Sequence, residues 1–182
     1  MRLSTFLRTE DDRTLTLLRF VLGAVMFAHG AQKVMGWFGG AGYGPSMAFL
    51  TQTLHIPAFL AFLAIAAEFL GGAGLLLGLL GRLDAFAIAV NMLAAIMLVH
   101  GQNGFFMNWS GSQPGEGIEY HLLALAMAAV IVLRGSGAWS LDRLLERNLT
   151  SGDSGTYIWS GTASLPGGYM AFYRRMFAFM RF

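Results

Sequence analysis

Ionisable side chains stand inside long apolar stretches of this sequence. His29 and Lys33 lie in the first stretch, and Glu68 lies near the middle of the second. Such residues cost roughly 2.5–3.5 kcal/mol each to place in a bilayer, so each one needs a partner or a function. A histidine and a carboxylate can exchange protons, and a lysine can hold an anionic or carbonyl oxygen. These residue types therefore fit proton handling at a small-molecule site.

A helical wheel gathers the polar residues of the first stretch on one side. The face from Arg19 to Lys33 spans about 80° and bears glycines, and His29 lies about 40° from Lys33. His29 and Glu68 share a level roughly 15 Å below the predicted outer ends of the first two spans. An ion pair at about 4 Å is worth on the order of 4 kcal/mol at an effective dielectric of 20. We therefore predict that Glu68 clusters with His29, Lys33 or both instead of facing lipid.

Three more polar residues lie where later apolar stretches end or begin. His100 ends the third stretch, and Glu119 and His121 begin the fourth. Two residues on a helix differ by about 200°, so Glu119 and His121 do not both face the bundle axis in a regular turn. One of them must serve a loop, a neighbour or solvent.

Two groups of candidate site residues follow from these positions. The candidate catalytic residues are His29, Lys33, Glu68 and Glu119, and the candidate cofactor-binding residues are His100, His121 and Arg19. A structural polar core, a pocket for a small molecule or quinone head group, and a metal or haem site remain open as interpretations. We assign no metal ligands, because no tight ligand spacing such as HExxH occurs.

Two polar residues have simpler interpretations. Arg19 is most simply an anchor to phosphates or a partner for Asp84 or Asp142. Asn91 lies on the opposite face of its stretch from His100, and we interpret it as an interhelical hydrogen bonder.

The composition requires a membrane to position these residues. Hydrophobic residues make up 55% of the 182 residues, charged residues make up 12%, and the mean hydropathy is +0.57. We predict four spans at residues 15–38, 58–80, 83–101 and 118–133, of which the last is the shortest. The predicted fold is an all-α integral membrane four-helix bundle with an extra amphipathic C-terminal segment. A buried core in a soluble protein would require polar outer faces that these stretches lack.

Charge and cysteine content exclude several classes of protein. Twelve Lys+Arg and ten Asp+Glu are too few and too scattered for a nucleic-acid surface. Because the chain has no cysteine, it contains no disulfide, thiolate metal site or CxxC redox motif. A redox role must therefore use another kind of cofactor or a partner.

Arginines set the expected orientation. They flank the first and fourth spans and occupy the turn at Arg82, whereas the loops 39–57 and 102–117 contain no Lys or Arg. The positive-inside rule then places both termini in the cytoplasm. A cleaved signal peptide is disfavoured, because acidic residues 10–12 stand where its positive region should be.

Four segments are expected along the chain. Residues 1–14 form a cytoplasmic N-terminal segment, and residues 15–149 form the transmembrane domain. Within that domain, Ser140 caps a short amphipathic helix that ends near Arg147. A polar linker at 150–168 precedes an amphipathic, basic and aromatic tail helix at 169–182, which is too short and too charged to span.

The order of several motifs resembles the DoxX family of small four-helix membrane proteins. The motifs cover roughly residues 14–145: Leu18 to Lys33, Glu68 to Leu79, His100 with Gly104 to Phe106, Glu116 to Tyr120, and Gly135 to Asp142. The resemblance implies a multi-pass protein of a bacterial-type inner membrane that is linked to redox chemistry. Relatives include the DoxD subunit of thiosulfate:quinone oxidoreductase. The residues in matching motifs are Arg19, His29, Lys33, Glu68, Glu119 and Asp142.

Competing functions remain open at this stage. One is a membrane subunit of a redox or quinone-linked complex, with the lipid bilayer and other membrane subunits as partners. The alternative is a non-catalytic accessory subunit whose polar cluster locks helix register. A permease is disfavoured, because four helices without paired broken segments offer little for alternating access.

Overall fold

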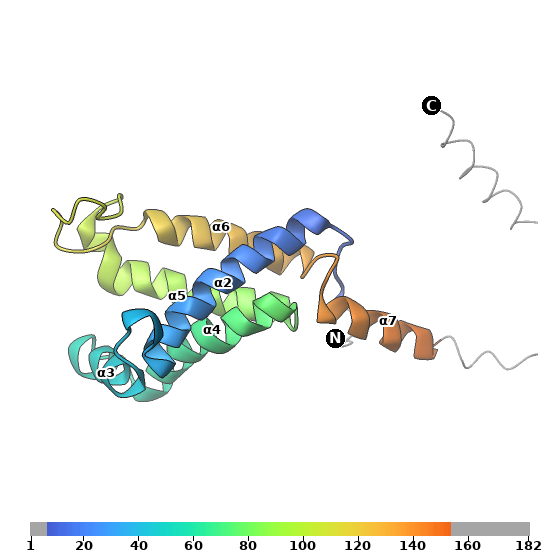
Figure 1. Cartoon of the computed structure of the whole chain (residues 1–182), viewed down its shortest axis with the longest axis horizontal. Coiled ribbons are helices and arrows are strands. Elements are labelled where there is room, and N and C mark those ends of the chain that lie inside the picture. The colour runs from blue at the N-terminus through green and yellow to red at the C-terminus, as the bar shows by residue number, and fades with distance from the viewer. Residues whose placement is uncertain (1–6, 154–182) are drawn as a thin grey trace, which may run out of the picture. The chain divides into compact units, whose positions relative to one another are not determined.

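The computed structural model describes residues 7–153, and every element in that range is helical (Figure 1). The elements in chain order are α2 (Arg13–Met35), a 3-10 turn (Trp37–Gly39), α3 (Tyr43–Ala48), a π-helical turn (Phe49–Thr53), α4 (Ala58–Leu77), α5 (Gly81–Ala95), a π-helical turn (Ile96–His100), a 3-10 turn (Gly101–Asn103), α6 (Glu119–Arg134) and α7 (Leu141–Asp153). The amphipathic helix expected to end near Arg147 thus continues to Asp153. The predicted tail helix 169–182 and the linker after residue 153 lie outside the described residues.

Helices α2, α4, α5 and α6 form a bundle, so the predicted all-α class is confirmed. Helix α2 packs chiefly on α4, and α5 packs on both α4 and α6. Figure 1 shows α3 at one end of the bundle and α7 at the other. We call these the loop end, which also carries the loop 101–118, and the arginine end, which also carries the turn 78–81.

Within residues 7–153, three helices are long and apolar enough to cross a membrane. They are Arg13–Met35, Ala58–Leu77 and the continuous stretch Gly81–Asn103. With 16 residues, α6 is about 24 Å long, which is less than the roughly 30 Å of a hydrocarbon core. The predicted fourth crossing therefore depends on how α6 is held by its neighbours.

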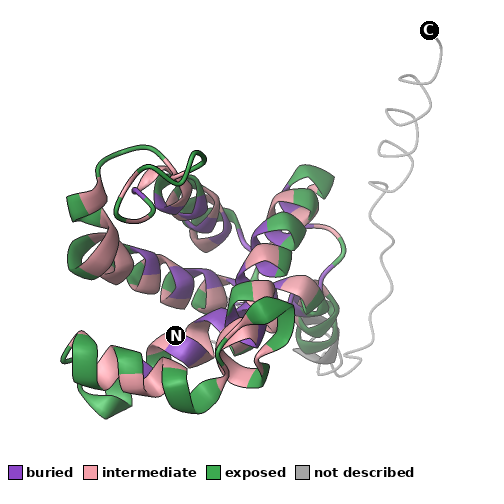
Figure 2. Cartoon of the chain, turned by 60° about the vertical axis from the view of Figure 1, so that its left-hand side comes forward, coloured by how far each residue is buried: buried purple, intermediate pink, exposed green. Residues whose placement is uncertain are grey.

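Much of the outer surface of the bundle is apolar. Leu22, Leu75, Ile88 and Ile131 belong to the buried core, which Figure 2 shows as a stripe on the inner faces of the helices. Many large apolar residues point outward, and they include Phe20, Phe59, Phe62, Leu70, Phe86, Val90, Leu93 and Leu123. Such extensive exposed apolar surface fits contact with lipid chains. The chain is a membrane protein.

Two glycines allow α2 and α4 to cross closely. A Cβ at Gly30 would meet the backbone of Phe69, and one at Gly72 would meet the backbone of Phe27. Small residues permit this approach in membrane bundles. The crossing brings the polar face of α2 against Glu68, which is the residue before Phe69.

Candidate functional site

Lys33 of α2 and Glu68 of α4 form an ion pair at the crossing of these helices. The Glu68 side chain is 10% exposed and that of Lys33 is 33% exposed. Asn91 of α5 donates from Nδ2 to Glu68 Oε1 at 3.0 Å and to the Ala64 carbonyl at 3.4 Å. Both carboxylate oxygens of Glu68 therefore have partners, and the contacts connect three helices. We call these three side chains, Lys33, Glu68 and Asn91, the ion-pair cluster.

His29 precedes Lys33 by about one helical turn and is exposed. It lies within electrostatic range of both Lys33 and Glu68. Its ring centroid is 5.8 Å from that of Tyr120 on α6, with the two planes tilted by 53°. Glu68 thus takes Lys33 as its ion-pair partner, and the imidazole of His29 faces the neighbouring helix.

Aromatic rings continue from Tyr120 toward α5. The Tyr120 and His121 centroids are 5.4 Å apart, and the His121 and His100 centroids are 4.2 Å apart. His100 Nδ1 lies 2.8 Å from the Glu116 carbonyl oxygen. His29, Tyr120, His121 and His100 form what we call the ring cluster. The candidate residues His100 and His121, far apart in sequence, are therefore neighbours.

Two polar atoms of the ring cluster have no hydrogen-bond partner in the described chain. They are Tyr120 Oη and His121 Nδ1, and both are buried. Adjacent residues on α6 carry them. The His121 imidazole also interacts with the backbone of Gly117. Leaving a buried donor or acceptor unpaired costs about 1–3 kcal/mol, so each such group needs an explanation. A ligand oxygen or hydroxyl placed beside these residues would satisfy them.

Glu119 and His121 point in different directions, as their helical spacing predicts. Glu119 Oε2 accepts a hydrogen bond from the Met107 backbone N–H at 3.2 Å, so Glu119 serves the loop. His121 is buried beside His100 of the π-helical turn that follows α5. The structure therefore does not bring Glu119 into the ion-pair cluster with the candidate catalytic residues Lys33 and Glu68.

Residues 14–101 match the DoxX family model. We call residues 14–101, which this match covers, the DoxX segment. The resemblance predicted from the motifs is thereby confirmed over α2, α4 and α5.

A curated relative extends the similarity further. The Bacillus subtilis (strain 168) protein named "Putative oxidoreductase CatD" is 26% identical over 137 residues, which cover 75% of this chain and 90% of the relative. No solved structure matches. The DoxX segment contains His29, Lys33, Glu68, Asn91 and His100, whereas Tyr120 and His121 lie beyond its matched residues.

Arg19, in the same DoxX segment, is buried at the arginine end of the bundle. Its guanidinium donates to the carbonyls of Ser136 at 2.8 Å, Leu76 at 2.9 Å and Trp139 at 2.7 Å, and also to that of Leu75. Two of these carbonyls belong to the last turn of α4, where a cation also complements the helix dipole. The surroundings of Arg19 support neither cofactor binding nor an anchor to lipid phosphates.

Asp142 stabilises the same end of the bundle without an ion pair to Arg19. Its Oδ1 accepts from the Leu80 backbone N–H at 2.6 Å. Its Oδ2 accepts from the Gly81 backbone N–H at 2.9 Å and from the Ser136 hydroxyl at 2.5 Å. Among the described residues, no direct ion pair joins Arg19 to Asp84 or Asp142. Asp142 does lie within electrostatic range of the Arg19 guanidinium.

The sequence pattern missed Asn91 and Tyr120 as members of the site. Asn91 is an interhelical hydrogen bonder, as predicted, but its partner is the site carboxylate Glu68. A polar residue within an apolar span must find a partner on a neighbouring helix, and this was the available signal. Tyr120 carried only a motif match. Within residues 7–153, no group of three or more His, Asp or Glu side chains is arranged to hold a metal ion.

Proposed function

We propose that this chain is a membrane subunit of a redox-linked assembly and binds a quinone head group, or a small molecule of similar carbonyl chemistry, at the ring cluster. The observation that carries the proposal is the pair of buried, unpartnered atoms Tyr120 Oη and His121 Nδ1. The tyrosine hydroxyl can donate to a ring carbonyl, and the aromatic rings offer faces against which a flat ligand stacks. The similarity to "Putative oxidoreductase CatD" supports the redox link.

Each neighbouring residue has a distinct proposed role. His29 is exposed beside the rings and exchanges the proton that accompanies reduction or oxidation of the ligand. Lys33 supplies positive charge near a developing oxygen anion. Glu68 holds Lys33 in place, and Asn91 in turn donates to Glu68. The chain has no cysteine to ligate an iron–sulfur cluster, and we propose that a cofactor of a partner subunit delivers the electrons.

Orientation is part of the proposal. Arginines gather where α7 and the turn 78–81 lie, so we place this end, with both termini, in the cytoplasm of a bacterial-type cell. Four crossings of the inner membrane, with α6 held among its neighbours despite its length, then expose the loop end outside. An impermeant thiol reagent should label Ser112→Cys in whole cells and leave Asn148→Cys, on α7, unlabelled. The reverse labelling pattern would contradict this orientation.

The ligand is tested on the purified full chain. We expect quinone in its lipid extract, and saturable binding of a short-chain benzoquinone that weakens about 5-fold or more in His29→Gln. The matched control is His55→Gln. His55 is exposed, lies just before α4 and is not part of the ring cluster. Equal binding by both variants, or no saturable binding at all, would contradict the proposal.

A non-catalytic accessory subunit is the second candidate. It is favoured by the ion-pair cluster, whose three side chains satisfy one another across α2, α4 and α5. Under this alternative, the cluster fixes the register of the helices, and the protein is recovered in a stoichiometric larger complex without quinone. The same lipid extract therefore separates the two candidates.

A further inference from the structure

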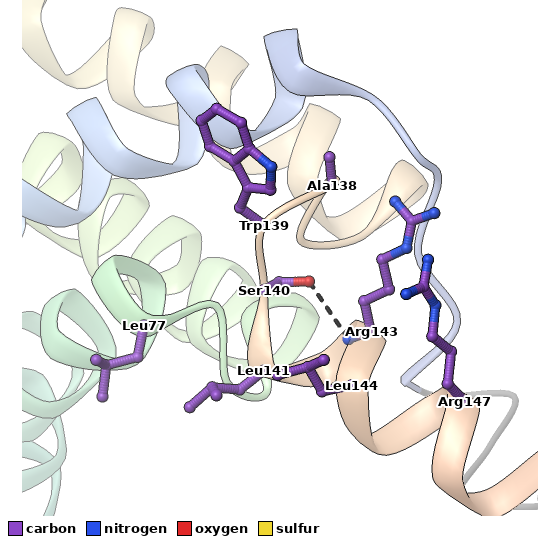
Figure 3. Close-up of a pocket in the computed structure, with 8 residues that line it drawn as sticks. All are labelled: Leu77, Ala138, Trp139, Ser140, Leu141, Arg143, Leu144 and Arg147. Carbon is purple, nitrogen blue, oxygen red and sulfur yellow. Dashed lines mark hydrogen bonds between the residues drawn. The ribbon is translucent and has the colours of Figure 1, made fainter.

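A groove lies at the arginine end, far along the bundle from the ring cluster. It has a volume of about 410 Å³ and is formed where the end of α4 meets the start of α7. Figure 3 shows its lining, in which the residues used below are Leu77, Trp139, Leu141, Leu144, Arg143 and Arg147. We propose that this groove binds an anionic phospholipid of the membrane leaflet that surrounds the arginine end.

The wall toward the bundle is apolar and faces outward. Leu77 is the last residue of α4, a helix long enough to cross the membrane, so it marks the edge of the hydrocarbon region. Leu77 and Trp139 are 58% and 70% exposed, and Leu144 of α7 is 55% exposed. Tryptophan is enriched at the membrane interface, where one side of the ring meets acyl chains. This wall suits the glycerol region and the first methylenes of a lipid.

The wall toward α7 is basic. Arg143 and Arg147 are four residues apart, so they emerge on the same side of the helix one turn apart. No acidic residue lines the groove. Arg143 also pairs with Asp11, but its guanidinium offers five N–H donors, of which that contact uses part. Arg13 adds a third cation, with its guanidinium carbon 5.8 Å from the centre of the Trp139 ring.

The order of these walls selects a lipid over a soluble anion. The groove passes from the apolar end of a spanning helix to a pair of arginines within one turn of α7. An anionic phospholipid has the same order, with its chains in the hydrocarbon region and its phosphate at the surface. Each arginine near an anionic leaflet contributes about 1 kcal/mol, which is roughly a 5-fold change in affinity.

The test uses the full chain, purified in a neutral detergent and titrated separately with dioleoyl-phosphatidylglycerol and dioleoyl-phosphatidylcholine. We expect preferential retention of phosphatidylglycerol, measured by mass spectrometry of the protein–lipid complex. The double variant Arg143→Gln/Arg147→Gln should lose roughly 20-fold in affinity for it. The matched control is Arg8→Gln/Arg134→Gln, which removes the same charge near the same end but outside the groove.

Arg143→Gln also removes the ion pair with Asp11 and could therefore weaken lipid binding by destabilising the fold, so a second variant is needed. Arg147→Gln alone leaves that pair intact and should lose roughly 5-fold in phosphatidylglycerol affinity. Equal retention of the two lipids, or an equal loss in the control, would overturn the proposal. So would competition by inorganic phosphate at concentrations similar to those of the lipid, or a lipid-independent dimer that Leu144→Gln dissociates.

Discussion

The two ends of the bundle treat their polar groups differently. At the arginine end, the Arg19 guanidinium donates to four carbonyls and the Asp142 carboxylate accepts three hydrogen bonds. At the loop end, the ion-pair cluster is also satisfied, but Tyr120 Oη and His121 Nδ1 are buried without partners in the described chain. Groups that satisfy one another stabilise the fold, whereas adjacent unsatisfied groups beside an exposed histidine favour a ligand site.

One atom departs from this division. Asp84 Oδ2, at the arginine end, is buried beside Gly74 without a hydrogen-bond partner in the described chain. It lies one turn into α5 and has no aromatic ring contact within the described residues. The ring cluster differs because two such atoms adjoin a series of rings and an ion pair.

The largest expected effect is at the arginine end. Arg19→Met removes the donors of four carbonyls in a buried place, so we expect a loss of about 3–5 kcal/mol in the free energy of unfolding in detergent. Arg134→Met is the matched control, because Arg134 is exposed and its ion pair with Glu10 is open to solvent. A denaturant titration of both variants measures the difference. An equal, small change in the stability of both variants would contradict a structural role for Arg19.

A smaller loss is expected at the ion-pair cluster. Glu68→Gln leaves Lys33 without its ion pair, and we expect the free energy of unfolding to decrease by about 1–3 kcal/mol. The decrease should be at the low end of this range, because the Lys33 side chain is 33% exposed. The double variant Lys33→Met/Glu68→Gln should lose less than the sum of the single variants. Asn91→Ala should also destabilise, because Asn91 donates to Glu68. Strict additivity in this cycle would show that the pair is not coupled.

The smallest effect is expected from acid. The Arg134 guanidinium lowers the pKa of Glu10, and the Arg143 guanidinium lowers the pKa of Asp11, mainly through side-chain hydrogen bonds. A carboxylate whose pKa is lower in the folded state contributes stability above its unfolded pKa, near 4, and this is lost as pH falls through the folded value. At pH values below about 4, the denaturant concentration at the midpoint of unfolding should therefore decrease slightly. The decrease should be smaller at high salt, because both carboxylates are exposed. If Arg143→Gln loses as much stability in acid as the unchanged protein, the pairing of Arg143 with Asp11 does not cause the loss.

The sequence predicted the helices and one contact of the site. The lengths of apolar stretches located α2, α4 and α5, and the wheel with the depth argument predicted a cluster of Glu68 with His29, Lys33 or both, of which the structure pairs Lys33 with Glu68. These succeed because helical geometry fixes which residues share a face and a level. The 200° separation also predicted that the side chains of Glu119 and His121 point in different directions. The structure shows that Glu119 is the one that points away from the bundle, because it accepts a hydrogen bond from the Met107 backbone N–H.

The remaining contacts depend on packing between distant segments. Asn91 reaches Glu68 only because of how α5 is rotated against α4. The carbonyls that bind Arg19 come from a helix end and from the loop at Ser136 and Trp139, and side-chain types do not mark free carbonyls in a sequence. Proximity of His100 to His121 likewise requires the packing of α5 on α6.

The most direct test of the contrast between the two ends is the single change Tyr120→Phe, measured for both unfolding stability and affinity for a short-chain benzoquinone. Because the hydroxyl has no partner in the described chain, its removal should leave stability unchanged or slightly higher. Affinity should fall about 5- to 10-fold, as for loss of one hydrogen bond. Tyr43→Phe, which removes a hydroxyl from α3, should change neither. A loss of stability with unchanged affinity would contradict the account and make the loop end as structural as the arginine end.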